Sequence, residues 1–150
     1  MDRRRRMLWR RCRRMVEALP LSAPFDPEEL VAALAERRGR PIELIQLPVR
    51  GRTPCGLLVT TDRADYIGYP SATTALHQQH ILLHELGHLL SGHVGTGELS
   101  AGAAQALLPN LSDELVHRVL GRTVYTELEE QEAELFASLA LHRPRHGSRV

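Results

Sequence analysis

Residues 84–88 read His-Glu-Leu-Gly-His, and their types and spacing suit the binding of a metal ion. On an α-helix, residues i and i+4 share one face with Cβ atoms roughly 5–6 Å apart, so His84 and His88 can bind one cation. Glu85 is turned partway round the helix, where a carboxylate can take a proton from water beside the metal. The pattern therefore predicts two Zn²⁺ ligands and a general base.

The residues around this motif favour an α-helix over 71–91. No proline or β-branched run follows Thr74, and Pro70 precedes a Ser/Thr cluster suited to an N-cap. His77 and His80 continue the stripe of the motif histidines, and we expect them to lie partly exposed beside the site. Leucines at helical spacing predict a buried face, made of Leu82, Leu83, Leu86 and Leu90.

A catalytic zinc site typically has three protein ligands and one open position, so a third ligand is needed. The metzincin pattern asks for Gly and His three and six residues after the second motif histidine, but Ser91 and Val94 stand there. His93 is one residue short of the required place, and with Gly92 it predicts the end of the helix. A second helix must supply the ligand.

Such a helix is predicted over 124–141, which contains no Gly or Pro and has Thr123 or Thr126 as candidate N-caps. Glu130 differs from the other acids of this segment because small residues share its stripe. Small residues let a helix approach another helix closely, and Gly87 in the metal motif is a matching small residue. The stripe consists of Ala133, Ala137 and Ala140.

The other glutamates of this helix are predicted to lie either in solvent or behind a metal ligand. Glu127, Glu129 and Glu132 fit the solvated face that an acidic helical run usually forms. Glu134 lies one turn beyond Glu130, where a carboxylate can accept the second N–H of a metal-binding imidazole. Glu130 is therefore the acid best placed to approach the motif.

Together the two segments resemble a known family. The motif HELGHLL at 84–90, followed by the pattern E-x-x-A-x-x-F-A at 130–137, is similar to the ImmA/IrrE-type metallopeptidases. These are small cytosolic gluzincins related to thermolysin. The resemblance covers residues 26–141 and implies a small zincin-like fold.

The resemblance also implies a ligand set for Zn²⁺. The glutamate that opens the second pattern is the third zinc ligand of the family, and it corresponds to Glu130. The residue after the alanine is usually Asn or Asp in the family, but Glu134, one methylene longer, stands here. Glu132 is therefore kept as a rival third ligand.

The chemistry expected of such a site is peptide hydrolysis. Zinc polarises the scissile carbonyl and acidifies water, while Glu85 takes the water proton and returns it to the leaving amine. A further donor for the oxyanion is expected, with His117, Tyr125, His93 and Tyr66 as candidates. Members of the family cleave helix-turn-helix repressors, so the resemblance implies a site-specific endopeptidase with such a protein substrate. The competing prediction is a zinc-stabilised module that binds a regulator without cutting it.

The rest of the sequence predicts one small α+β domain. A chain of 150 residues with 43% apolar content can bury a single core. Asp26, Pro27 and Gly39 mark the ends of a helix over 27–38. Strands are expected at 42–47, 56–60 and 64–69, with a short helix at 112–120 after a connection at 95–111. We expect a mostly antiparallel sheet packed on the motif helix, with a free edge of the third strand that could pair with an extended peptide.

Charge is distributed unevenly along the chain. Residues 1–14 carry eight Arg and one Asp, and residues 143–150 carry three Arg, whereas the part between them holds eight Arg against 17 acids. A basic N-terminal segment is typical of nucleic-acid binding. However, apolar residues recur there at helical spacing, which favours a helix docked on the acidic body. Those residues are Leu8, Trp9, Cys12, Met15, Val16 and Leu19.

The predicted organisation is a basic helical arm at 1–25, the metallopeptidase domain at 26–142 and a short basic tail at 143–150. No segment has the roughly 20 apolar residues needed to span a bilayer, and no apolar stretch of a secretion signal follows the first arginines. We therefore expect a cytoplasmic protein with no membrane partner. Cys12 and Cys55 are isolated in sequence and predict reduced, inert thiols.

Overall fold

The computed structural model describes residues 2–21, 25–47, 56–60, 64–70, 73–93 and 125–143. This part of the chain is a mixed α+β structure of four helices and one three-stranded sheet. In chain order the elements are α1 (Arg3–Glu17), α2 (Pro27–Arg38), β1 (Ile42–Leu47), β2 (Leu57–Thr60), β3 (Asp65–Pro70), α3 (Ala75–Leu90) and α6 (Glu127–Leu141). The helix expected at 112–120, the connection at 95–111 and the tail beyond 143 lie outside the described residues.

The sheet has the strand order β1-β3-β2, so β3 is its central strand. β1 runs parallel to β3 with Ile42 opposite Asp65, and β2 runs antiparallel to β3 with Leu57 opposite Gly68. The predicted mostly antiparallel sheet is therefore wrong, as is the predicted free edge of the third strand. Every residue of β3 is buried, which is typical of a strand covered on both faces and on both edges. The outer strands are β1 and β2.

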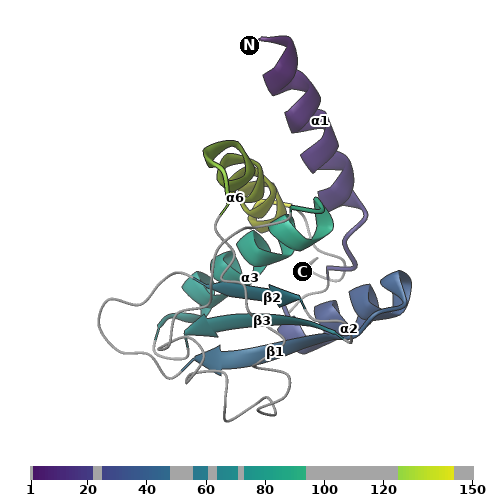
Figure 1. Ribbon diagram of the computed structural model, residues 1–150, viewed down its shortest axis with the longest axis vertical. Helices are drawn as coiled ribbons and strands as arrows, with labels where there is room; N and C mark the ends of the chain where they lie inside the picture. The colour runs from purple at the N-terminus through teal and green to yellow at the C-terminus, as the bar shows by residue number, and fades with distance from the viewer. Residues whose placement is uncertain are drawn as a thin grey trace, which may run out of the picture.

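The helices form successive layers on this sheet (Figure 1). α3 packs on β2 and β3, α6 packs on α3, and α1 packs on α6, while α2 packs on β1. The N-terminal end of α1 extends away from the sheet in this view. One apolar core joins the layers, and its fully buried members include Cys12, Ile67, Leu83, Leu86, Phe136 and Ala137.

The helix ends follow the capping residues that the sequence contains. Asp26 accepts hydrogen bonds from two backbone amides at the start of α2, and Gly39 ends that helix with a φ of 67°. Thr74 caps α3. Thr126 and Glu129 form a reciprocal capping box at the start of α6. The predicted span of α2 is confirmed. Of the Ser/Thr candidates, Thr74 and Thr126 are the caps, so α6 begins at Glu127, later than predicted.

The predicted docking of the basic N-terminal helix is also confirmed. Cys12 and Val16 of α1 are buried in the common core, and Leu19 just after the helix is buried with them. Arg143 donates hydrogen bonds to the backbone oxygens of Val16 and Leu19, so the chain after α6 holds the end of α1. The separation of residues 1–25 from the following domain stays a prediction.

A buried ion pair fixes the start of the central strand. The Asp65 side chain is 1% exposed, and one of its oxygens lies 2.9 Å from Arg38 Nη1 and 3.1 Å from Arg40 Nε. The two arginines stand at the end of α2 and in the turn that follows it. Because both guanidinium groups pair with this one carboxylate, it holds the end of α2 against the start of β3.

No described helix combines the length and apolar character needed to cross a bilayer.

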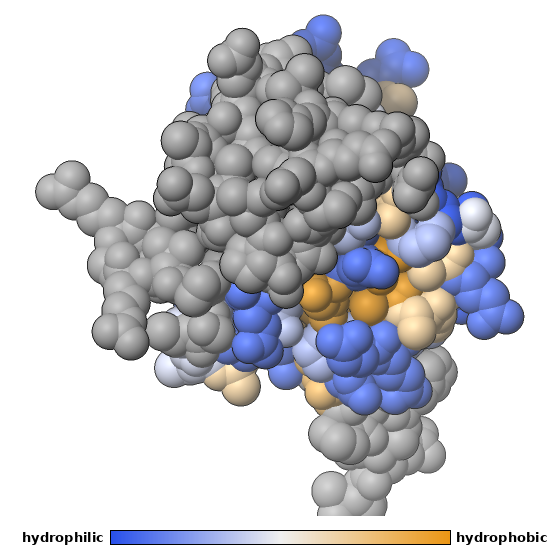
Figure 2. Space-filling model, turned by 60° about the horizontal axis from the view of Figure 1, so that its bottom comes forward, coloured by the Kyte–Doolittle hydropathy of each residue, from blue (hydrophilic) through white to orange (hydrophobic). Residues whose placement is uncertain are grey.

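On the face seen in Figure 2, apolar residues gather in one area that is bordered by hydrophilic ones.

Candidate metal centre

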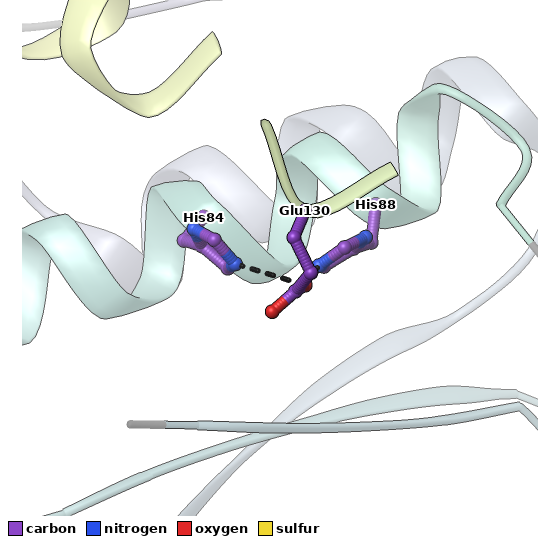
Figure 3. A group of neighbouring side chains, drawn as sticks. All are labelled: His84, His88 and Glu130. Atoms are coloured by element: carbon purple, nitrogen blue, oxygen red, sulfur yellow. Dashed lines mark ion pairs between the residues drawn. The ribbon is translucent and has the colours of Figure 1, made fainter. Parts of the chain in front are cut away.

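Three side chains that could hold a metal ion meet where α3 and α6 cross. His84 and His88 project from one face of α3 toward Glu130 of α6 (Figure 3). Glu130 Oε1 lies 2.5 Å from His88 Nε2 and 3.5 Å from His84 Nε2. One ligand atom from each residue falls within 4.8 Å of the other two. Two imidazole nitrogens and a carboxylate oxygen are a donor set that zinc prefers.

The close approach of the two helices depends on small residues, as predicted. A Cβ atom on Gly87 would lie 3.1 Å from backbone atoms of Ala133 and 3.1 Å from the ring of Phe136. Such contacts are too tight for an ordinary side chain in a packed core. Because Gly87 lies between the two motif histidines in sequence, its missing side chain lets α6 bring Glu130 within reach of both.

The environment of His88 fits a neutral, metal-binding imidazole. Burial lowers the pKa of His88 to about 4, although the neighbouring Glu130 acts in the opposite direction. His88 Nε2 is buried against the Glu130 carboxylate. Ligand atoms bound tetrahedrally to one zinc ion are roughly 3.4 Å apart. The His84–Glu130 distance already fits that spacing, and the His88–Glu130 pair would have to open slightly.

Glu85 lies on the side of α3 that faces Gly56 and the sheet. It is buried, and desolvation followed by repulsion from Glu130 raises its pKa to about 8. A Cβ atom on Gly56, which precedes β2, would lie 3.0 Å from Glu85 Oε2 and 2.7 Å from Ile81 Cγ2. Gly56 therefore leaves space for the side chains of Glu85 and Ile81. The sequence did not predict this, because a single glycine before a strand does not indicate which residues pack against it.

Glu134 and His80 lie on the outer side of His84. Glu134 Oε2 is 3.0 Å from His84 Nδ1, and Glu134 Oε1 is 2.7 Å from His80 Nε2. Burial acts to raise the pKa of Glu134, but the hydrogen bonds from His84 and His80 outweigh it and the pKa is lowered. This contact is the one expected of a carboxylate that accepts the second N–H of a zinc ligand.

Glu132 has a different place from the one expected. It is 7% exposed, so the prediction of a solvated side chain is wrong. Of the two glutamates considered as third ligand, Glu130 lies with His84 and His88, whereas Glu132 Oε2 lies 3.1 Å from His93 Nε2. Glu132 is buried because it lies on the face of α6 that packs on α1 and on the end of α3.

Two of the four candidates for oxyanion stabilisation, Tyr125 and His93, contact His88. The ring of Tyr125 stacks on that of His88, with centroids 3.6 Å apart. His93 contacts His88 through Nδ1. Tyr66 is 6% exposed in the central strand, which leaves little of its surface for a substrate. His117 lies outside the described residues.

Comparisons with protein-family models, with curated proteins and with solved structures find no match for this chain. The similarity to the ImmA/IrrE-type metallopeptidases therefore rests on the residues of the two motifs.

Proposed function

We propose that this protein is a zinc-dependent endopeptidase with a small zincin-like domain. The observation that carries the proposal is the meeting of Glu130 from α6 with His84 and His88 from α3. The buried Glu85 beside the first histidine would add a proton acceptor, because a bound Zn²⁺ favours the carboxylate form and so opposes the burial that raises its pKa to about 8. A site that only stabilised the fold would not need Glu85 at this position.

Zinc bound by these three residues would polarise a carbonyl oxygen and make water more acidic. The chain's own residues then have distinct tasks. His84 and His88 would bind the ion through Nε2, and Glu130 would bind it through its carboxylate. The Glu85 carboxylate takes one proton from water as the water oxygen bonds to the peptide carbon. It passes the proton to the nitrogen as the C–N bond breaks, which leaves an acid and an amine.

For the substrate, we propose a regulatory protein of the helix-turn-helix repressor class. The support is the resemblance of the motifs at 84–90 and 130–137 to those of a family that cleaves such repressors. A repressor substrate would place the enzyme in the cytoplasm. Cleavage of one or a few proteins would make the activity specific.

The metal site can be tested directly by zinc analysis. Purified protein reconstituted with Zn²⁺ and passed over a desalting column should retain about one zinc per chain. His84→Ala, His88→Ala and Glu130→Ala should each lose it, whereas Glu85→Gln should retain it. Glu127→Ala, an exposed glutamate of the same helix, is the matched control. Retention of zinc by Glu130→Ala would contradict the proposed ligand set.

Hydrolysis is tested with a diverse peptide library whose new ends are read by mass spectrometry. Zinc-loaded protein should produce cleavages that disappear in Glu85→Gln and in chelator, because the proton acceptor or the metal is missing. The same comparison on a co-expressed helix-turn-helix repressor tests the substrate. If Glu85→Gln regulated that repressor as fully as the unmodified protein, the chain would be a binding module and not a peptidase.

A further inference from the structure

On the side that faces away from Glu130, His88 begins a chain of side-chain contacts that ends at the N-terminal helix α1. His88 Nδ1 lies 2.9 Å from His93 Nδ1, and His93 Nε2 lies 3.1 Å from Glu132 Oε2. Glu132 Oε1 in turn lies 3.5 Å from Arg11 Nη1. The four residues come from α3, the turn after it, α6 and α1. The basic N-terminal helix thus reaches the candidate metal centre through two intervening side chains.

The direction of each hydrogen bond follows from what each group can donate. A carboxylate only accepts, so the proton of a neutral His93 lies on Nε2, facing Glu132. His93 Nδ1 is then an acceptor, and His88 Nδ1 must carry the proton that it receives. The Nε2 atom of His88 faces the Glu130 carboxylate, which attracts the same proton from the other side when no metal is bound. The contact with His93 favours the Nδ1–H tautomer, whose Nε2 lone pair can bind a metal.

Local structure explains why His93 returns to His88. Gly92 has a φ of 72°, and the amides of Gly92 and His93 donate to the carbonyls of Leu89 and His88. This is the Schellman arrangement of a helix end, in which a left-handed glycine folds the chain back over the last turn. The imidazole of His93 is thereby placed against the ring nitrogen of His88, five residues earlier.

Arg11 holds the other end of the chain of contacts in two ways. Besides its ion pair with Glu132, Arg11 Nη2 donates a 3.2 Å hydrogen bond to the backbone oxygen of Ser91, the C-cap of α3. A cation at a helix C-terminus is stabilised by the exposed carbonyls there. The next residue, Cys12, is fully buried, and its thiol donates to the backbone oxygen of Glu132 over 3.7 Å. Arg11 therefore contacts both helices that supply the metal-binding side chains.

We propose that Arg11, Glu132 and His93 are positioning residues of the metal site, so that docking of α1 is part of forming it. The proposal rests on the proposed zinc site, but it concerns how His88 is oriented rather than what the site hydrolyses. Glu132 provides the fixed negative charge, His93 transmits the orientation, and Arg11 keeps Glu132 turned toward His93. Arg11 is half exposed, so it is expected to contribute less than the two buried residues.

The orientation is tested by two-dimensional NMR of the ¹⁵N-labelled histidine rings in metal-free Glu130→Ala protein, which lacks the carboxylate that competes for the proton on Nε2. His88 should carry its proton on Nδ1, which is the less common tautomer in water. Adding Glu132→Ala should shift it toward the Nε2–H form, and adding Glu132→Gln, which keeps an acceptor and the volume, should retain it. An Nε2–H His88 in the Glu130→Ala protein would overturn the proposal. The readout needs no metal, so it separates this proposal from the zinc site itself.

The consequence for metal binding is tested by competition with a chromogenic zinc chelator. Glu132→Ala and His93→Ala should weaken zinc binding roughly 10- to 100-fold, the usual effect of removing a group behind a metal ligand. Arg11→Ala should weaken it about two- to fivefold, as for a solvent-accessible ion pair. Arg10→Ala removes the same charge from an exposed position on the same helix and should leave binding unchanged.

A double-mutant cycle decides whether Arg11 acts through Glu132. In the Glu132→Ala background, Arg11→Ala should cause no further loss of zinc affinity, because the residue that it holds is gone. An undiminished loss in that background, or an Arg11→Ala affinity equal to that of Arg10→Ala, would overturn the role of α1. A Glu132-dependent Nδ1–H tautomer, together with an unmodified protein that binds no zinc, would support the orientation and contradict the proposed zinc site.

Discussion

His84 and His88 lie one turn apart on the same helix, yet their outer nitrogen atoms are held by different parts of the molecule. His84 Nδ1 meets Glu134 directly, at a surface where the carboxylate is 49% exposed. His88 Nδ1 meets His93, behind which Glu132 is buried against α1. Solvent can replace a lost partner on the His84 side but has little access to the His88 side. The two ligands should therefore respond differently to substitutions around them.

The largest effect is expected at Gly87, because the positions of both His84 and His88 relative to Glu130 depend on it. Gly87→Val would place a branched side chain against the backbone of Ala133, 3.1 Å from the position of the first added atom. The helices must move apart, which should abolish zinc binding and lower the free energy of unfolding by roughly 1–3 kcal/mol. Zinc retention and urea unfolding measure both. Ala75→Val, at an exposed position of α3, is the control for the helix propensity of valine.

The reactivity of Cys12 measures how well α1 covers Glu132 and His93 behind His88, because the Cys12 thiol contacts the backbone oxygen of Glu132. Burial, followed by the nearby charge of Glu132, raises the pKa of this thiol to about 11. In a Cys55→Ser background at pH 7.5, the folded protein should react with a thiol reagent about 100-fold more slowly than the unfolded chain. The rate should climb tenfold per pH unit toward pH 11, because the thiolate is the reactive form. Equal rates in folded and unfolded protein would contradict the docked position of α1.

A smaller effect is expected on the exposed side. Glu134→Ala leaves His84 Nδ1 without its carboxylate, but water can take its place. Zinc affinity should fall about two- to tenfold, less than in Glu132→Ala. Chelator competition measures both variants, with Glu127→Ala as the control from the exposed face of α6. An equal or greater loss in Glu134→Ala would reverse the proposed difference between the two sides.

The smallest effect is expected for His80, whose Nε2 contacts Oε1 of Glu134, the oxygen that does not meet His84. His80→Ala should change the free energy of unfolding by no more than about 0.5 kcal/mol and leave zinc affinity within about twofold. Thermal unfolding and chelator competition measure these changes. His77→Ala, an exposed position one turn earlier in α3, provides the comparison.

Much of the local structure could be predicted from the sequence because its signals are local. Asp26 and Gly39 delimit α2, Thr74 and Thr126 start the two helices of the site, and each acts on backbone groups within a few residues. The alanine stripe of α6 also predicted close packing, since helical periodicity fixes which residues share a face. The order and direction of the strands could not be predicted in this way, because β1 pairs with β3 across an intervening strand in the chain.

The sequence by itself determined the motif helix with His84, Glu85 and His88 on it, because a fixed helical period places residues four apart on one face. It also singled out Glu130 by its small neighbours. Only the tertiary structure decided that Glu132 is buried and that Arg11 reaches it. Those contacts join residues more than one hundred positions apart, and no local rule of helix or turn geometry relates α1 to α6. Packing in three dimensions therefore makes two similar histidines unequal.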